Sequence, residues 1–202
     1  MIAGHLVAVW RRAARIRWGA TDDEAVRELP GDALVAELSW TTTRAISIDA
    51  PCEQVWPWVA QIGQERGGFY SFERLENLIG CRIRNAERIV DDWQHPTVGE
   101  EVHLHPAAPA LQVAVLEPGR TFVLRGASAD SGDPQTASVW GFHLRPSGPM
   151  GCRLIERTRT RHGRSLLQRL TFGPALVEPI GFVMSREMLR SIKERVERAA
   201  HR

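Results

Sequence analysis

The chain has 202 residues, of which 43% are hydrophobic and 25% are charged, and its net charge is +2. These values predict one globular domain, or one domain with an appended segment, and they exclude a largely disordered protein. The charge is uneven, because residues 1–20 contain four arginines and no acidic residue. Such a basic end can contact a membrane surface or an acidic partner, or form a solvated helix face. Basic charge alone, without a known nucleic-acid-binding motif, does not predict nucleic-acid binding.

Residues 1–40 are predicted to form an N-terminal helix and a polar entry segment that closes at Pro30-Gly31. The apolar part of this helix is far shorter than a membrane span needs, and its charges follow the apolar stretch instead of preceding it, unlike a signal peptide. We expect the helix to lie on the domain or on a membrane surface. Residues 1–20 are therefore a candidate for peripheral membrane contact.

Residues 41–202 are predicted to form the main domain. Residues 41–50 alternate as a strand, with Ile46 and Ile48 on one side. Apolar residues at helical spacing then predict a helix from Pro51 to Ile62 and, after the corner at Gly67-Gly68, a second short helix. That second helix is expected to bury Phe72, Leu75, Leu78 and Ile79. Further strands are predicted at 100–106, 111–126 and 137–161, and a long helix at 177–200.

This order of elements predicts an α+β fold with a curved antiparallel sheet wrapped around the long C-terminal helix. Two short helices follow the first strand. A curved sheet cannot collapse fully onto a single helix, so a ligand cavity is expected between them.

Several segments resemble a known superfamily: "TTTRAISIDAPCEQVWPWVAQIGQERGGFYSFERLENLIGC", then "VGEEVHL", "SVWGFHL" and "CRLIERTRTR". They are similar to a bacterial branch of the SRPBCC (START/birch-pollen-allergen-like, polyketide cyclase type) superfamily, over roughly residues 41–200. The resemblance implies a helix-grip fold with a deep, largely apolar cavity. It also implies binding of lipids, sterols, hormones or polyketides, and in a few members cyclisation of polyketides or hydroxylation of aromatics with an added metal domain. A fold shared by many functions does not by itself identify one.

Seven residues are the candidate ligand-binding set: Trp58, Tyr70, Glu76, Trp140, Phe142, Arg157 and Met188. The aromatic members form either the cavity wall or the packed core. Glu76 lies beside the predicted apolar face of its helix, where a buried carboxylate needs a positive partner. Arg157 can bind an acidic group of a ligand if its side of the strand faces the cavity. The opposite orientation, with the arginines of that strand outside, is left open.

The cysteines and histidines predict no metal site and no disulfide. Cys52, Cys81 and Cys152 are an odd number without C-x-x-C spacing, which favours a reducing cytoplasm and small buried thiols. His103 and His105 share one side of a strand but lack a third ligand at a suitable spacing. We expect no metal and no redox cofactor.

The sequence favours a cytoplasmic protein that binds a small, largely apolar molecule. The first alternative is a cyclase- or hydrolase-like enzyme with Glu76 as general base on a polyketide-like substrate. The second is a lipid handler that contacts membranes through its basic N-terminal helix. These three hypotheses can be distinguished by measurement, because only the enzyme predicts turnover and only the lipid handler predicts salt-sensitive membrane binding.

Overall fold

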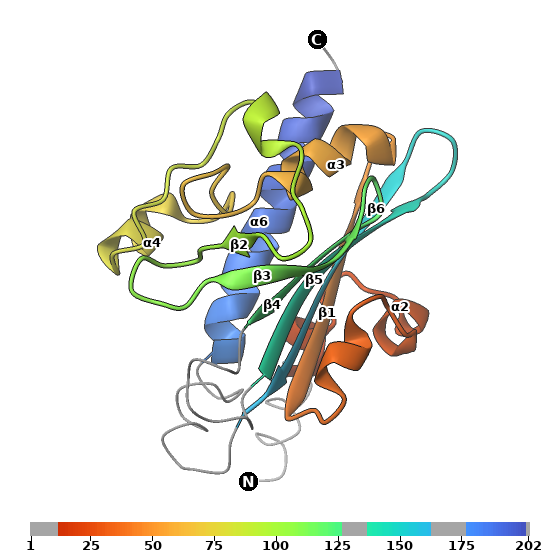
Figure 1. Ribbon diagram of the computed structural model, residues 1–202. Coiled ribbons are helices and arrows are strands. Elements are labelled where there is room, and N and C mark those ends of the chain that lie inside the picture. Colours follow the sequence, from red (N-terminus) through yellow and green to blue (C-terminus); the bar gives the residue numbers. More distant parts are fainter. Residues whose placement is uncertain (1–11, 127–136, 163–176, 201–202) are drawn as a thin grey trace, which may run out of the picture.

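A single antiparallel sheet of six strands is the centre of the computed structural model, which describes residues 12–126, 137–162 and 177–200. The strand order is β1-β6-β5-β4-β3-β2, so strands β2 to β6 form a meander and β1 pairs with β6 at the far edge (Figure 1). The strands are β1 (Trp40–Ile48), β2 (Glu101–Val102), β3 (Leu111–Glu117), β4 (Thr121–Gly126), β5 (Ala137–Pro146) and β6 (Cys152–Arg161). The strand predicted at 100–106 is wrong in extent, because only Glu101 and Val102 pair with β3, and His103 and His105 lie beyond it.

The long helix α6 (Val177–Ala200) crosses one face of the curved sheet. Its residues Met188, Leu189 and Ile192 are fully buried in the main hydrophobic core, as their helical spacing predicted. Ile48 of β1 belongs to the same core, because alternate residues of a strand point to the same face of the sheet. The predicted α+β architecture, a curved sheet around the C-terminal helix, is confirmed.

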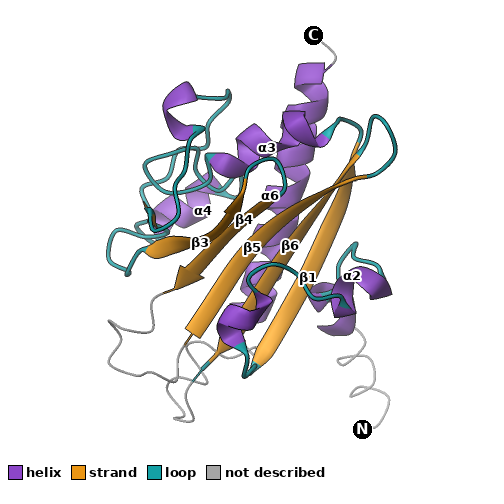
Figure 2. Ribbon diagram, turned by 45° about the vertical axis from the view of Figure 1, so that its right-hand side comes forward, coloured by secondary structure: helices purple, strands orange, loops and turns teal. Residues whose placement is uncertain are grey.

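The segment before β1 covers the opposite face of the sheet, where Figure 2 shows α2 (Asp22–Val26). Leu29 packs there against Ala45 and Ile155, and the 3₁₀ helix η1 (Asp32–Val35) packs beside them. A capping box between Thr21 and Glu24 fixes the start of α2, because each residue's side chain accepts a hydrogen bond from the other's backbone N–H. The sheet is therefore covered on both faces.

Helix α3 (Cys52–Ala60) follows β1 and packs beside α6. A disulfide joins Cys52 at its start to Cys152 at the start of β6. The prediction that no disulfide forms is wrong, because it was based on cysteine spacing along the chain. Ile48 lies directly opposite Cys152 in the β1–β6 register, and this pairing brings Cys52 close to Cys152. The predicted cytoplasmic location loses the support that it drew from the absence of a disulfide, and Cys81 is a buried free thiol as expected.

Candidate functional site

A cavity of about 330 Å³ lies between the inner face of the sheet and the first half of α6. Strands β1, β5 and β6 form its floor, and residues from the chain between α3 and β3 close its side. Most of its wall is apolar. The large apolar side chains of the wall are Trp40, Phe69, Leu104, Leu111, Trp140, Met184 and Met188. A pocket of this size, apolar with a few polar groups, is typical of small-molecule sites.

Three of the seven predicted site residues line this cavity. Trp140 lies on β5, Met188 on α6, and Glu76 on the short helix α4 (Glu73–Leu78). The sequence periodicity placed Trp140 and Met188 on the inner faces of their elements, and both lie there. Their contact with a ligand stays a prediction.

Trp58, Tyr70 and Phe142 do not line the cavity; they are buried in the core behind its wall. The Trp58 and Tyr70 rings pack edge to face with their centroids 5.7 Å apart. Phe142 lies against Trp140, with 4.8 Å between ring centroids. Sequence periodicity identified Trp58 and Phe142 as inward-facing, and the glycine corner drew attention to Tyr70. Neither signal could separate the core from the cavity wall, because both lie on the same side of the sheet.

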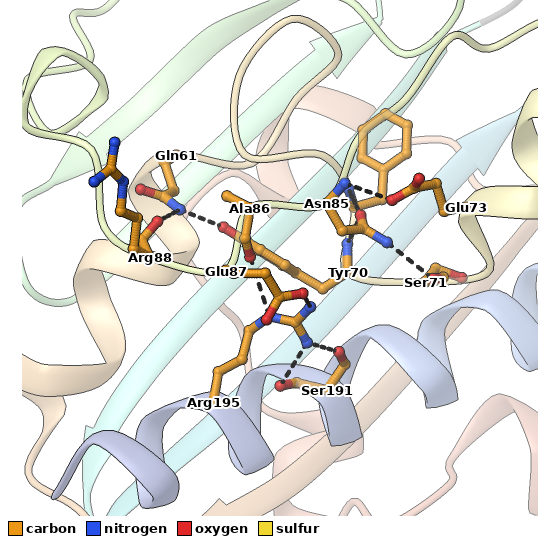
Figure 3. A network of polar contacts seen from close by, with 11 residues as sticks. Gln61, Tyr70, Ser71, Glu73, Asn85, Ala86, Glu87, Arg88, Ser191 and Arg195 are labelled. Atoms are coloured by element: carbon orange, nitrogen blue, oxygen red, sulfur yellow. Dashed lines mark hydrogen bonds and ion pairs between the residues drawn. The ribbon is translucent and has the colours of Figure 1, made fainter. Parts of the chain in front are cut away.

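The corner at Gly67-Gly68 turns the chain so that Tyr70 enters the core (Figure 3). The Tyr70 hydroxyl accepts a hydrogen bond from Gln61 Nε2 at 2.9 Å, and the Arg195 guanidinium lies 5.3 Å from its ring centroid. Burial raises the pKa of the Tyr70 hydroxyl. The only tyrosine of the sequence therefore connects the corner to α6 and does not act at the mouth of the cavity.

The corner is fixed by Asn85, a residue that no pattern in the sequence indicated. Its Oδ1 accepts hydrogen bonds from the backbone N–H groups of Phe69 and Tyr70, and its Nδ2 donates to the carbonyl of Ser71 (Figure 3). Tyr70 has a φ of 54°, a left-handed conformation that is unusual for a residue with a side chain. Asn85 stabilises this conformation, which directs Phe69 and Ser71 toward the cavity.

Arg157 lies on the face of the sheet away from the cavity, so the prediction that it anchors a ligand there is wrong. Its Nη1 donates to Asp32 Oδ2 at 2.6 Å and to the carbonyl of Arg27 at 2.8 Å. Its Nη2 donates to the carbonyl of Glu24 at 2.6 Å. The reason is the strand parity that the sequence left open: Glu156 and Thr158 face the cavity, and Arg157 faces the segment before β1.

A buried polar cluster in the cavity floor takes the place expected for Arg157. Glu156 Oε1 accepts hydrogen bonds from Trp140 Nε1 and Ser185 Oγ, both at 2.8 Å. Arg44 donates from Nη1 to Ser185 Oγ at 2.9 Å and lies 3.7 Å from Glu156 Oε2. Arg44 also lies 3.9 Å from a carboxylate oxygen of Glu178. The signal for this cluster was present in the sequence, because Arg44 has the same strand parity as Ile46 and Ile48 and so belongs to the apolar face.

Glu76 reaches the cavity because α4 is turned the opposite way from its predicted orientation. Leu75, Leu78 and Ile79 are 57%, 82% and 70% exposed, whereas Glu76 is 2% exposed. The predicted apolar face of this helix is therefore wrong. The helix has only six residues and the tight corner before it sets its rotation, so its own amphipathic pattern does not.

The environment of Glu76 favours its protonated form. Burial and, to a lesser degree, the negative charge of Glu73 raise the pKa of its carboxyl group to about 7. Among the described residues, neither of its oxygens has a hydrogen-bond partner. The predicted positive partner is therefore not found in the described part of the chain, and a carboxyl group with a pKa of about 7 lines an apolar cavity.

The described ranges contain no group of three His, Cys, Asp or Glu side chains that could hold a metal ion. His105 is instead hydrogen-bonded locally: its Nε2 lies 3.0 Å from the carbonyl oxygen of Ile79, and its Nδ1 accepts from the N–H of Ala107. No described helix is long and apolar enough to cross a membrane.

The predicted membrane contact through residues 1–20 lies partly outside the described residues, which begin at residue 12. The described part contacts the domain: Arg15 donates from Nε and Nη2 to the two carboxylate oxygens of Glu178, at 3.2 and 3.0 Å. Trp18 packs against the main core. Membrane contact stays a prediction.

Comparisons with known proteins bear on the fold. No protein-family model matches the sequence, and no curated protein matches it. Among solved structures, a protein of Thermobifida fusca is 15% identical, with a TM-score of 0.50 over 78% of this chain and 93% of that one. The chain has a helix-grip fold. This is the fold of the superfamily that the sequence resembles.

Two further helix-grip structures are enzymes by their names. The Zhui aromatase/cyclase of Streptomyces sp. R1128 is 11% identical, with a TM-score of 0.46 over 80% of this chain and 95% of that one. A norcoclaurine synthase of Thalictrum flavum is 14% identical, with a TM-score of 0.44 over 80% and 96%. At these identities the likeness concerns the fold alone, so the function is argued from the cavity itself.

Proposed function

We propose that the protein binds a small, largely apolar molecule in the cavity between the sheet and α6. The observation that carries this proposal is the cavity of about 330 Å³, which side chains leave unfilled between apolar walls. Protein interiors are otherwise packed to the density of organic crystals. Glu76 is the buried carboxyl of this apolar site that has no hydrogen-bond partner among the described residues, and it is a group that can select a ligand.

Gly181 offers a direct test, because it lines the cavity and, apart from its chain neighbours and the backbone of its own helix, a Cβ atom added there meets no atom of the described residues within 4 Å. Gly181→Leu is expected to fill part of the cavity without a clash. Since leucine is a better helix former than glycine, we expect the variant to unfold at the same or a higher temperature. Its affinity for naphthylmethanol, a neutral apolar probe, should fall at least tenfold in calorimetric titration.

The matched control is Val183→Leu, which adds volume to the same helix at a side chain that is 50% exposed. It should leave probe binding unchanged. A Gly181→Leu protein that is folded and binds the probe as tightly as the parent would contradict the proposed site.

A catalytic role is a second candidate, favoured by one observation: the buried Glu76 carboxyl has its pKa raised to about 7. A carboxylate of this basicity in an apolar site can remove a proton from a carbon next to a carbonyl group. We expect the parent to accelerate cyclisation or hydrolysis of a short poly-β-keto thioester, with a rate that rises through about pH 7 as Glu76 ionises.

Loss of turnover in Glu76→Gln, by about 10²- to 10⁴-fold with substrate binding retained, would support the catalytic role. No acceleration by the parent over buffer would leave binding as the function of the cavity. Product formation followed by chromatography distinguishes these outcomes.

A further inference from the structure

The buried polar atoms that lack partners concentrate at the cavity. Among the described residues, these atoms are Thr42 Oγ1, Glu76 Oε1 and Oε2, Glu156 Oε2, His143 Nδ1 and Arg159 Nε. Thr42, Glu76 and Glu156 all line the cavity. Buried polar groups in proteins nearly always have a hydrogen-bond partner, so a cluster of exceptions in one place needs an explanation.

The unpartnered atoms at the cavity define what a ligand must supply. Both oxygens of Glu76 and Oε2 of Glu156 accept hydrogen bonds when ionised, and the Thr42 hydroxyl can accept one as well. Glu156 Oε1 already receives its donors from Trp140 and Ser185. When Glu76 is ionised, a ligand that satisfies the remaining atoms brings N–H or O–H donors into the cavity.

The charges around the cavity favour a cation over a neutral donor. Three carboxyl groups line it, those of Glu76, Glu156 and Glu178, against one guanidinium, that of Arg44. Arg44 lies between Glu156 and Glu178, and Arg15 adds a second positive charge to Glu178. Glu76 is left without a cation among the described residues, and it is 2% exposed. An ionised carboxylate in such a position needs a positive partner, which the described part of the chain does not provide.

An acidic ligand fits this site poorly. Its carboxylate would face Glu76, and the Arg44 guanidinium is already engaged with Ser185, Glu156 and the carbonyl of Arg15. We infer that the ligand is an apolar molecule carrying a protonated amine, and that the amine binds the carboxylate of Glu76. This inference rests on the proposed function and names the chemical class of its ligand.

The test uses three probes that share one apolar body and differ in their polar group: naphthylmethylamine, naphthylmethanol and naphthoic acid. Each is titrated into the full-length parent and into Glu76→Gln, at a pH where the amine is protonated and Glu76 is ionised. A charge-assisted hydrogen bond contributes enough that Glu76→Gln should weaken amine binding about 10- to 100-fold. Binding of the alcohol should change far less. Glu53→Gln, the same change at an exposed position of α3, is the control and should leave all three affinities as they are.

The outcomes separate this inference from the proposed function. Preference of the parent for the amine, lost in Glu76→Gln, supports both. Two results would overturn the inference that the ligand carries an amine. In the first, the alcohol or the acid binds the parent as tightly as the amine does. In the second, Glu76→Gln binds the amine as tightly as the parent does. In either case the proposed function stands, provided that Gly181→Leu weakens the probes that bind. Failure of all three probes to bind the parent overturns both.

Discussion

Glu76→Gln is expected to raise the free energy of unfolding by on the order of 2–3 kcal/mol above about pH 7 and by little at pH 4. The pKa of Glu76 is raised from 4.5 to about 7 in the folded protein. Between these values the folded state binds more protons than the unfolded state. The stability of the parent therefore falls as the pH rises through this window, and a glutamine removes the loss. Urea unfolding of parent and variant from pH 4 to pH 8 measures the difference.

The difference between the two proteins isolates Glu76 from other titrations. His143, buried on the other face of the sheet, has its pKa lowered to about 4 by burial and by Arg157, so its contribution to stability is lost as the pH falls. This opposite slope is present in both proteins and cancels. The side chain of Glu73, whose negative charge contributes to the raised pKa of Glu76, is also present in both proteins. A gain that is the same at all pH values would contradict the raised pKa.

A more stable Glu76→Gln protein with weaker ligand binding would also identify Glu76 as a functional residue. The carboxylate destabilises the empty protein, so a bound cation would recover that free energy on binding. A purely structural residue would show the opposite, a loss of stability on replacement.

The second large effect is expected at the disulfide between Cys52 and Cys152. Replacing both cysteines by alanine should lower the free energy of unfolding by about 2–4 kcal/mol, because the bond closes a long loop in the unfolded chain. The two cysteines are 100 residues apart in the sequence. Denaturant unfolding of the oxidised parent and the double variant measures this difference.

Two controls define this result. With a strong reductant, the parent should lose most of its advantage over the double variant. Cys81→Ala, which removes the buried free thiol, should not respond to the reductant differently from the parent. Titration of thiols in the denatured parent without reductant should find one group, and finding three would contradict the disulfide.

The sequence predicted the positions of the long secondary-structure elements closely, because period and composition along the chain decide them, whereas the strand predicted at 100–106 is only Glu101–Val102. The alternating residues of 41–50, 111–126 and 137–161 are strands, and the helix predicted at 177–200 is α6 (Val177–Ala200). The inner faces of long elements were also predictable: Met188 and Trp140 lie where their spacing placed them. Long elements average over many contacts, so their patterns are reliable.

Short elements were not predictable in this way. The six residues of α4 present Leu75, Leu78 and Ile79 to solvent and bury Glu76, because the neighbouring corner sets the rotation of the helix. The apolar pattern of this helix had predicted instead that the leucines and Ile79 would be buried. Glu76 was therefore a candidate from the sequence, but only the tertiary structure explains why it is buried and lines the cavity.

The sequence by itself determined the strands, the long helix and hence the helix-grip fold, since local periodicity encodes them. Only the tertiary structure decided which side of β6 faces the cavity, and with it that Glu156 lies inside and Arg157 outside. It also decided the pairing of Cys52 with Cys152 and the isolation of Glu76. The physical reason is common to all three: each depends on contacts between segments far apart in the chain, which no local pattern records.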